Sequence, residues 1–345
     1  MRETTVLQVG PVAGMPGGMA SVIAEYLTFA LPGYRMRSYP TYFPSRRLRG
    51  LSAAVLFPVW FALRHRKSSV IVHVHLSEGG SFVREGLVVL WGALLGLPVV
   101  ASLHGAEFDQ FAATRQRLVK AVLARCRTVL CLGPVQAQLV AGLTSRPDIA
   151  LVFNPVAPVE GAPTSERESV VLFGGEVGPR KGIDRLLAAW PAVVERIPDA
   201  RLVICGPLVT ELGALPPSVS YEGTLSRDVL RKRLGTARVA CLPSRREVLP
   251  MFILEALAAG SRVVATKAGE WRSFDGARTI SWVDNAGEAV VPQLARALVA
   301  ALVEKSSAAD QQSDASWLEA HASARAVGEV LRRTYLSLSE EGNHV

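Results

Sequence analysis

Short apolar runs rich in β-branched residues alternate with helical patterns along the 345 residues of this chain, and the alternating series begins twice. Buried parallel strands have such continuous β-branched runs because helices cover both faces of their sheet. The length allows about two domains of ordinary size. The pattern therefore predicts an α/β protein with two doubly wound, Rossmann-like domains.

The two series are separated by a stretch rich in proline and glycine, residues 154–168, which we interpret as a linker. We expect an N-terminal domain over residues 1–157 and a C-terminal domain over residues 158–315. The remaining residues, 316–345, contain a helical pattern from 316 to 338 that could pack on either domain, including back on the N-terminal one. The strands expected cover residues 5–9, 70–75, 98–103, 128–132 and 150–153, then 169–173, 200–205, 219–222, 238–242 and 262–265.

The four cysteines form no CxxC pair, and no histidine cluster accompanies them at the spacing of a zinc site. We expect buried free thiols, as in a reducing compartment. Residues 1–8 carry one arginine and then a strand-like run, without the apolar region of a signal peptide. We therefore expect a cytoplasmic protein. The cysteines are Cys126, Cys131, Cys205 and Cys241.

The stretch from residue 26 to residue 77 has no acidic residue. Its apolar segment, residues 51–63, is too short to span a bilayer. A basic, aromatic and apolar surface suits an anionic membrane interface, so we predict peripheral contact of residues 34–67 with the cytoplasmic face of the inner membrane. The alternative is a core helix with a solvated basic flank, and without a nucleic-acid motif we expect no nucleic-acid partner. The basic residues are Arg35, Arg37, Arg46, Arg47, Arg49, Arg64, Arg66 and Lys67, and the aromatic ones Tyr34, Tyr39, Tyr42, Phe43, Phe57, Trp60 and Phe61.

A second apolar run covers residues 87–103, and the sequence Gly96-Leu97-Pro98 interrupts it. A glycine and a proline two residues apart are typical of a turn. The run therefore predicts a buried helix, a turn and a buried parallel strand instead of a membrane span.

Residues 243–260 carry the clearest chemistry. They predict a loop that holds Glu247, followed by a helix with Pro250 in its first turn, where the missing N–H costs nothing. Near Met251 such a helix presents free amides beyond the strand ends, which makes an anion site suited to a diphosphate. Glu255 lies about one turn inside the helix among apolar residues, so its carboxylate needs a partner if it is buried. The two carboxylates could hold sugar and ribose hydroxyls.

In this setting the two glutamates resemble the E-x7-E motif of retaining GT-B glycosyltransferases, in particular the group 1 family, or family 4. A Pro-Ser pair precedes the motif, and an Ala-rich helix, a glycine and a strand follow it, as in that family. The resemblance covers most of the chain. It implies two Rossmann-like domains facing a central cleft, with the acceptor bound by the first domain and a nucleoside-diphosphate-sugar donor by the second.

The resemblance also implies a hexosyltransferase that retains anomeric configuration and needs no metal and no cofactor. The sequence has no DxD motif, which agrees with metal-independent transfer. By the same resemblance Glu247 orients the donor sugar, Glu255 holds the ribose, and amides near Pro250 and Met251 bind the diphosphate.

A glycine-rich turn, residues 173–182, is similar to the phosphate-binding turn of that family. Gly174 lets the backbone approach the donor, and Lys181, with Arg180, neutralises the diphosphate. The family usually has an arginine directly after the first glycine, and this chain has Gly175 there. Arg180 or Arg245 could take the place of the missing cation.

The N-terminal half carries two further matches. A loop after the first strand, residues 14–19, contains Gly17 and Gly18 and resembles the family's glycine-rich loop, where backbone can approach the donor. It lacks the G-x-G-x-x-G spacing of a dinucleotide site. His104, at a strand end, matches the family's cleft histidine, which contacts the transferred sugar, so we place it with Glu247 and Lys181 as candidate catalytic residues.

Other polar residues follow the same strand ends. His75, Glu78, Arg84 and Glu107 are candidate acceptor contacts, because ligands bind at the carboxyl edge of a doubly wound sheet. His73 alternates with His75 on one strand and is expected to belong to the core.

The sequence thus predicts a retaining glycosyltransferase that moves a sugar to a lipid-linked glycan acceptor in exopolysaccharide or cell-envelope biosynthesis. One alternative, prompted by Gly175, is a catalytically weak GT-B protein that acts as a binding or assembly partner. Another is a sugar-nucleotide epimerase, which would need further acid/base residues. A membrane or nucleic-acid adaptor would leave Glu247 and Glu255 without a purpose.

Overall fold

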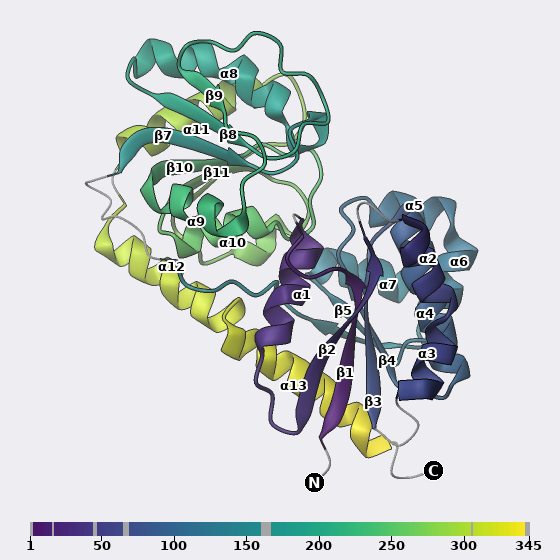
Figure 1. Cartoon of the computed structure of the whole chain (residues 1–345). Coiled ribbons are helices and arrows are strands. Elements are labelled where there is room, and N and C mark those ends of the chain that lie inside the picture. The colour runs from purple at the N-terminus through teal and green to yellow at the C-terminus, as the bar shows by residue number, and fades with distance from the viewer. Residues whose placement is uncertain are drawn as a thin grey trace. The chain divides into compact units, whose positions relative to one another are not determined.

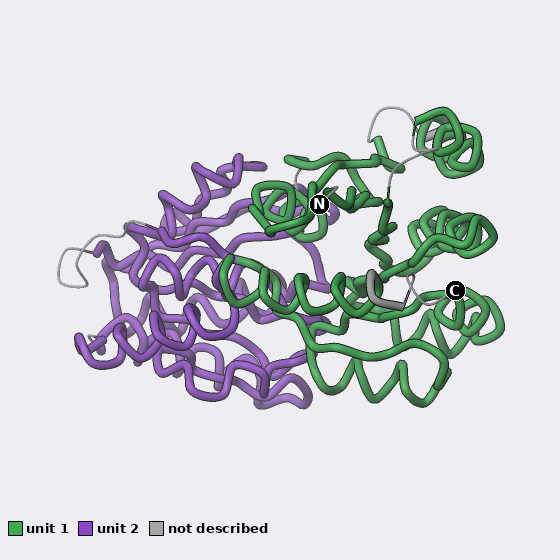
Figure 2. The backbone as a smooth tube through the Cα atoms, turned by 90° about the horizontal axis from the view of Figure 1, so that it is seen from below, with its two compact units in different colours: residues 1–155, 324–345 green, residues 156–323 purple. Residues whose placement is uncertain are grey.

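The computed structural model describes residues 3–15, 17–43, 47–64, 69–159, 167–304 and 306–341. Pro16, Arg46, Arg66, Lys67 and the linker residues 160–166 lie outside the described residues. The chain forms two compact units, drawn in different colours in Figure 2. Unit 1 contains Met1–Pro155 and Ala324–Val345, and unit 2 contains Val156–Ser323.

Unit 1 contains a parallel six-stranded sheet in the order β2-β1-β3-β4-β5-β6 (Figure 1). This order reverses direction beside β1, as in a doubly wound sheet. The predicted α/β fold is confirmed for this half. The strands are β1 (Thr4–Pro11), β2 (Tyr34–Tyr42), β3 (Val70–Leu76), β4 (Val99–Leu103), β5 (Thr128–Cys131) and β6 (Asp148–Leu151).

The edge strand β2 was not expected from the sequence. Its burial is mixed, with Tyr34, Tyr39 and Thr41 buried and Arg35, Arg37 and Ser38 exposed. An edge strand that is partly exposed to solvent lacks the continuous apolar run of the central strands. Its arginines and proline therefore masked it.

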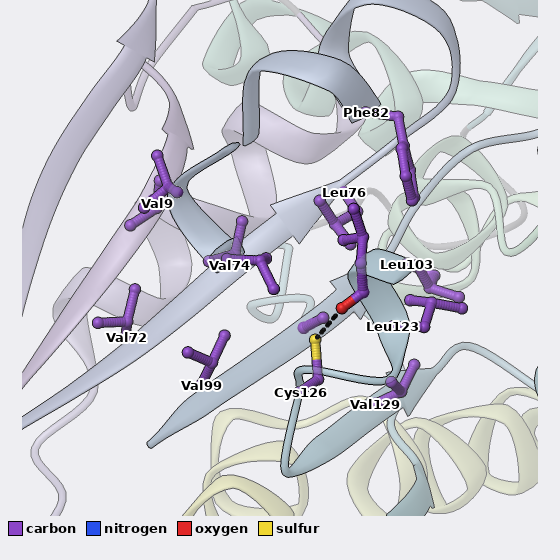
Figure 3. Close-up of a cluster of buried hydrophobic side chains, with 14 of the residues drawn as sticks. Val9, Val72, Val74, Leu76, Phe82, Val99, Leu103, Leu123, Cys126 and Val129 are labelled. Carbon is purple, nitrogen blue, oxygen red and sulfur yellow. Dashed lines mark hydrogen bonds between the residues drawn. The ribbon is translucent and has the colours of Figure 1, made fainter. Parts of the chain in front are cut away.

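Helices cover both faces of this sheet, so its central strands β3 and β4 are buried on both sides. On β3, Val72, Val74 and Leu76 face a core built with α2, α3, α4 and α6, part of which Figure 3 shows. The alternate residues His73 and His75 point to the opposite face. The helices are α1 (Gly18–Thr28), α2 (Arg47–Val55), α3 (Phe57–Arg64), α4 (Gly79–Leu94), α5 (Phe108–Thr114), α6 (Gln116–Leu123), α7 (Pro134–Leu143) and α13 (Ala324–Glu341).

The C-terminal helix pattern resolves into two helices. The helix predicted over 316–338 is interrupted at Ala322 and Ser323, so residues 316–321 belong to α12 of unit 2 and α13 belongs to unit 1. In Figure 1, α13 (yellow) runs beside α1. Tyr335 of α13 reaches the sheet, where its ring lies 5.5 Å from that of Tyr34.

Unit 2 repeats the architecture with a six-stranded sheet in the order β12-β11-β10-β7-β8-β9, again with parallel pairs. The second predicted doubly wound sheet is confirmed. Its strands are β7 (Glu168–Gly174), β8 (Arg201–Cys205), β9 (Val219–Tyr221), β10 (Ala237–Leu242), β11 (Arg262–Thr266) and β12 (Ile280–Val283). Its helices are α8 (Ile183–Arg196), α9 (Arg227–Thr236), α10 (Met251–Ala258), α11 (Val290–Val303) and α12 (Ala308–His321), with 3-10 turns η2 (Pro179–Lys181) and η3 (Trp271–Phe274).

The aromatic residues of the basic stretch do not form the surface that the sequence suggested. Tyr39 and Phe57 are buried, and Trp60 and Phe61 pack against the core of unit 1. Aliphatic side chains of α2 and α3 are exposed instead, and we call this set the α2–α3 face. Its members are Leu51, Val55, Leu56, Val59 and Leu63, with exposures of 51%, 48%, 54%, 58% and 80%.

All four cysteines are free and buried, as predicted. The second apolar run forms the end of α4, a turn and β4, which is also as predicted. Within the described ranges, no helix has both the length and the apolar composition that crossing a bilayer requires.

Candidate functional site

The carboxyl edge of the unit 2 sheet holds an ion pair between two predicted site residues. The Lys181 Nζ lies 2.5 Å from Glu247 Oε1, and the Ser244 hydroxyl donates to the same oxygen over 2.7 Å. The side chains of Lys181 and Glu247 are 15% and 9% exposed. We call Lys181, Ser244 and Glu247 the charged edge, and their partial burial strengthens the electrostatic attraction between them.

Close backbone contacts bring the two loops of the charged edge together. Gly182 has φ +77°, and a Cβ there would lie 2.0 Å from the Pro243 carbonyl oxygen. Gly269 has φ +59°, and its Cβ would lie 2.2 Å from the Glu247 carbonyl oxygen. Only glycine fits such positions, because of both its backbone freedom and its lack of a side chain. The Arg245 N–H also donates to the carbonyl of Arg180 over 2.8 Å.

The helix α10 begins directly after the Glu247 loop. Pro250 is its N-cap residue, one position earlier than the first-turn place that the sequence suggested, and Met251 is its first helical residue. No side chain caps this end of the helix. Its first amides therefore carry the partial positive charge of a helix N-terminus beside the charged edge.

Glu255 lies inside α10 and is 4% exposed. Its Oε1 accepts from Arg227 Nε of α9 over 2.6 Å. The sequence indicated that a buried Glu255 needs a partner. It did not identify Arg227, because α9 and α10 become neighbours only in the fold. In this arrangement Glu255 holds Arg227.

The arginines that could replace the missing cation are both paired with carboxylates. Arg245 makes a bidentate pair with Asp184 at 2.6 and 2.7 Å, and hydrogen bonding by Arg245 lowers the pKa of Asp184. Arg180 Nε lies 3.5 Å from Glu176 Oε1. Gly174 has no room for a side chain, because a Cβ there would lie 2.3 Å from the ring of Phe252.

The glycine-rich loop of unit 1 joins β1 to α1. Gly17, with φ +130°, is the N-cap residue of α1, and Gly18 is its first residue. No side chain caps this end, and a Cβ on Gly17 would meet no atom within 4 Å. The loop is thus open above the helix N-terminus.

A chain of imidazoles ends at the carboxyl edge of the unit 1 sheet. His104 Nε2 lies 2.9 Å from His75 Nδ1, and His75 Nε2 lies 2.8 Å from Gln8 Oε1. Gln8 and His75 are 0% exposed, while His104 is partly exposed. Both ring nitrogens of His75 are hydrogen-bonded inside unit 1. The expected direct contact of His75 with an acceptor is therefore wrong, and His75 contacts His104 instead.

The second arm of this chain runs through His73, which belongs to the core as expected. Its Nδ1 lies 2.7 Å from the Tyr335 hydroxyl, and its Nε2 lies 2.7 Å from Ser102 Oγ. Burial lowers the pKa of His73 to about 3, that of His104 to about 4, and that of His75 well below its usual value. All three rings are therefore neutral near pH 7.

The remaining predicted acceptor residues lie at the starts of α4 and α5. Glu78 precedes α4, and its Oε2 would lie 1.8 Å from a Cβ on Gly105, the residue after His104. Glu107 precedes α5. Arg84 donates to Glu85 over 2.8 and 2.9 Å and lies 5.1 Å over the ring of Tyr42.

Glu85 was missed by the sequence analysis. It is 0% exposed and accepts from Thr41 over 2.6 Å and from Ser81 over 2.9 Å, and burial raises its pKa. A carboxylate at a buried helical position was the available signal, as it was for Glu255. Gln8 and Tyr335 gave no such signal, because their partners lie far away in the sequence.

Comparison with known proteins supports the family expected from the sequence. Residues 168–304, which include the charged edge and α10, match the family model of the group 1 glycosyl transferases. The family model, the curated relatives and the solved structures together support a group 1 GT-B glycosyltransferase.

The relatives of this glycosyltransferase are distant. It is 25% identical to an uncharacterized glycosyltransferase of Methanocaldococcus jannaschii. The aligned 206 residues cover 50% of the chain and 52% of that relative. It is 27% identical to a phosphatidyl-myo-inositol mannosyltransferase of Mycobacterium tuberculosis over 78% of the chain and 75% of that protein. The chain thus spans about half the length of the first relative and three quarters of the second.

Solved structures confirm the GT-B fold. The Anabaena protein HepE, crystallised with UDP and glucose, matches with a TM-score of 0.71 at 14% identity, over 96% of this chain and 99% of HepE. Sucrose-phosphate synthase from Thermosynechococcus elongatus matches with a TM-score of 0.70 at 17% identity, over 99% of this chain and all of that chain (100%). The predicted resemblance to group 1 GT-B glycosyltransferases is therefore confirmed.

This glycosyltransferase departs from the usual pattern of its family at Gly175. Its φ is +143°, a conformation that residues with side chains rarely adopt, and a Cβ there would lie 3.6 Å from Lys181 Cε. Among the residues that the structure describes, no group of three or more His, Cys, Asp and Glu could hold a metal ion.

Proposed function

We propose that the protein transfers a sugar, with retention of anomeric configuration, from a nucleoside-diphosphate sugar to a lipid-linked acceptor in glycan biosynthesis of the cell envelope. The observation that carries this proposal is the 2.5 Å pair of Lys181 and Glu247 beside the uncapped start of α10. A partly buried cation next to helix amides stabilises the charge that develops on a departing diphosphate.

In this proposal the donor is held by unit 2. Lys181 leaves Glu247 to bind the diphosphate, assisted by Arg180 and by amides of Pro250–Met251. Glu247 then accepts hydrogen bonds from the donor sugar, Glu255 lies near the ribose, and Gly174 permits close backbone approach. No metal or other cofactor takes part. The relatives named for UDP-glucose complexes and for mannosyl transfer support a nucleotide-sugar donor.

The acceptor is proposed to bind unit 1. His104 contacts the transferred sugar, and Glu78, Arg84 and Glu107 lie around the same sheet edge. The arginine, fixed by Glu85 and Tyr42, offers a cation to an acceptor phosphate. Phosphatidylinositol mannosyltransferases among the relatives support a lipid-linked acceptor.

Calorimetric titration with UDP, GDP and ADP tests the donor site. Selective binding of one nucleotide is expected, and Lys181→Ala should weaken it by about tenfold to a hundredfold, as for a lost charge-assisted hydrogen bond. Lys232→Ala, which removes an exposed lysine of α9, is the matched control and should bind as the wild type does. If none of the nucleotides binds to the wild-type protein, the donor site does not function.

That negative outcome would favour the second candidate, a GT-B protein that acts as a binding or assembly partner. The observation behind it is the pairing of both substitute arginines with carboxylates, while Gly175 supplies no cation. Turnover of the free sugar nucleotide into an isomer without acceptor would instead support an epimerase.

Peripheral membrane contact is the remaining part of the proposal, and the α2–α3 face is its basis. Five exposed aliphatic side chains lie with exposed Arg49 and Arg64 in a stretch that has no acidic residue. Aliphatic groups enter the interface while arginines attract anionic headgroups. In this proposal the protein acts on the cytoplasmic face of the membrane that carries its acceptor.

Co-sedimentation with vesicles tests that contact. The protein is expected to bind vesicles that contain an anionic phospholipid and not vesicles of a zwitterionic one. Leu63→Asp should reduce binding several-fold, whereas Val303→Asp, at a position 67% exposed in unit 2, should not. Equal, negligible sedimentation with both lipids would exclude the contact.

A further inference from the structure

A continuous chain of hydrogen-bonding side chains connects the C-terminal helix α13 to His104. The Tyr335 hydroxyl lies 3.4 Å from Gln8 Nε2, Gln8 Oε1 lies 2.8 Å from His75 Nε2, and His75 Nδ1 lies 2.9 Å from His104 Nε2. Tyr335, Gln8 and His75 are each 0% exposed. Water therefore does not compete for these contacts, and each donor must meet an acceptor within the chain.

The orientation of the Gln8 amide is fixed by its surroundings. The Met36 sulfur lies 3.5 Å from Gln8 Nε2. A thioether sulfur can only accept a hydrogen bond, so the amide nitrogen and not the carbonyl oxygen must face it. The oxygen then faces His75, where it can only accept.

This orientation determines the tautomers of the next two rings. Because Gln8 Oε1 accepts, His75 must carry its proton on Nε2. A neutral His75 then has a lone pair on Nδ1, which needs a donor. His104 is the group within reach, so its proton lies on Nε2.

The contacts from Gln8 through Tyr335 and His73 to Ser102 agree with this orientation of the Gln8 amide. Gln8 Nε2 donates to the Tyr335 hydroxyl, which donates in turn to His73 Nδ1, and His73 Nε2 donates to Ser102. Every contact has one donor and one acceptor. The reverse assignment would require all of these groups to switch together and would place the Gln8 oxygen against the Met36 sulfur.

The geometry of the rings holds His104 in one orientation. The rings of His75 and His104 are inclined by 20°, with centroids 5.1 Å apart. That separation fits two rings side by side in nearly one plane, joined by an N–H···N bond, and is long for face-to-face stacking. Within the described part of the chain, His104 Nδ1 has no hydrogen-bonding partner in the protein, so it remains an acceptor.

We propose that Gln8 and His75 are positioning residues that fix His104 as its Nε2–H tautomer, with Tyr335 of α13 holding the Gln8 amide, so that the Nδ1 lone pair accepts a hydroxyl of the transferred sugar. The inference rests on the proposed function for the role of His104. The tautomer itself is a property of unit 1 and requires no substrate.

Nitrogen NMR of the full chain, labelled with 15N-histidine and recorded without ligand near pH 7.5, tests the proposal directly. The two nitrogens of a neutral imidazole resonate far apart, and the protonated one is identified by its coupling pattern. A His104→Ala sample assigns the signals. His104 is expected to show a protonated Nε2 and an unprotonated Nδ1, and a protonated Nδ1 would overturn the proposal.

Two variants test the positioning role. Gln8→Leu removes the acceptor of His75 Nε2, so the His104 nitrogens should lose their wide separation and move toward a common shift. Tyr335→Phe should move them partly in the same direction. Ser102→Ala is the matched buried control, which should alter His73 and leave His104 unchanged. Unchanged His104 signals in Gln8→Leu would overturn the role, and if that variant does not fold, the wild-type spectrum and Tyr335→Phe still decide.

These spectra distinguish the inference from the proposed function. If the wild-type protein shows the expected tautomers but binds no nucleotide, the proposed chain of hydrogen bonds to His104 is supported and the proposed donor site is rejected. If a nucleotide binds but His104 carries its proton on Nδ1, the donor site is supported and the proposed tautomer is rejected.

Discussion

Both units contain a parallel six-stranded sheet, with different strand orders, and the polar groups at their carboxyl edges differ in charge and burial. In unit 2, charged groups meet: Lys181 pairs with Glu247, and Arg245 with Asp184. In unit 1, His75 and His104 are held neutral, because burial lowers their pKa values. The difference follows from access to solvent, since the charged residues stand on loops whereas the imidazole chain is buried between strands and helices.

The comparison teaches that a doubly wound sheet offers two kinds of polar site. Loops joined through Gly182 and Gly269 can present ion pairs at the sheet edge, where a ligand could reach them. Buried side chains such as His75 can only act through fixed hydrogen bonds, because charging them is costly. The first kind suits a diphosphate, and the second suits orientation of a neutral hydroxyl.

The largest expected effect is a difference in acid stability between the units. His73, His75 and His104 have folded pKa values far below the usual 6.5, so the unfolded state binds more protons below pH 6.5. Stability is therefore complete above pH 6.5 and is lost as pH falls toward about 4, with a slope of up to about 4 kcal/mol per pH unit for three protons.

Amide hydrogen exchange at pH 7 and pH 5, expressed as protection factors, measures this effect. Protection of β1 and β3 should fall steeply at pH 5, while that of β7 and β10 should change little. The one described histidine of unit 2, His321, is exposed and provides the internal control. Equal loss in both units would show that the imidazoles do not set the acid sensitivity.

The sequence predicted the charged edge better than the imidazole chain, for a physical reason. Glu247, Glu255 and Lys181 stand in local strand-loop-helix patterns, so their spacing already indicates a helix N-terminus and an anion site. The partners Gln8 and Tyr335 are 327 residues apart and meet only because α13 returns to unit 1.

The fold followed the same rule of locality. Central strands were predicted because they are buried on both faces and are rich in β-branched residues, as β3 is. The edge strand β2 was missed because it is partly exposed and has no continuous apolar run. The aromatic rings of Tyr39 and Phe57 were misplaced on the surface because residues 26–77 were taken as one basic patch. Composition alone does not show which side of a strand or helix a ring occupies.

The second prediction compares a buried ion pair of unit 2, between Arg227 and Glu255, with an exposed one on the same helix. Arg227→Leu should cost about 3 kcal/mol of unfolding free energy, because it leaves Glu255, 4% exposed, without its arginine. Urea denaturation measures the loss. The matched control on the same helix is Arg233→Leu, whose pair with Glu222 is exposed and should be worth less than about 1 kcal/mol. Equal losses would mean that Glu255 is held by its other neighbours.

The smallest expected effect concerns Gly175, where this chain departs from its family. Gly175→Ala should lower the unfolding free energy by about 1–2 kcal/mol, because alanine is strained at φ +143° although its Cβ would have room 3.6 Å from Lys181. Gly142→Ala is the control, since it lies in α7, has no unusual φ and would meet no atom within 4 Å, so it should be neutral or slightly stabilising. Urea denaturation of both variants gives the comparison. A Gly175→Ala variant as stable as the wild type would show that this turn relaxes readily to a conformation open to side chains. An arginine could then be introduced there, and the absence of this second cation beside Lys181 would be due to the sequence and not to a backbone constraint.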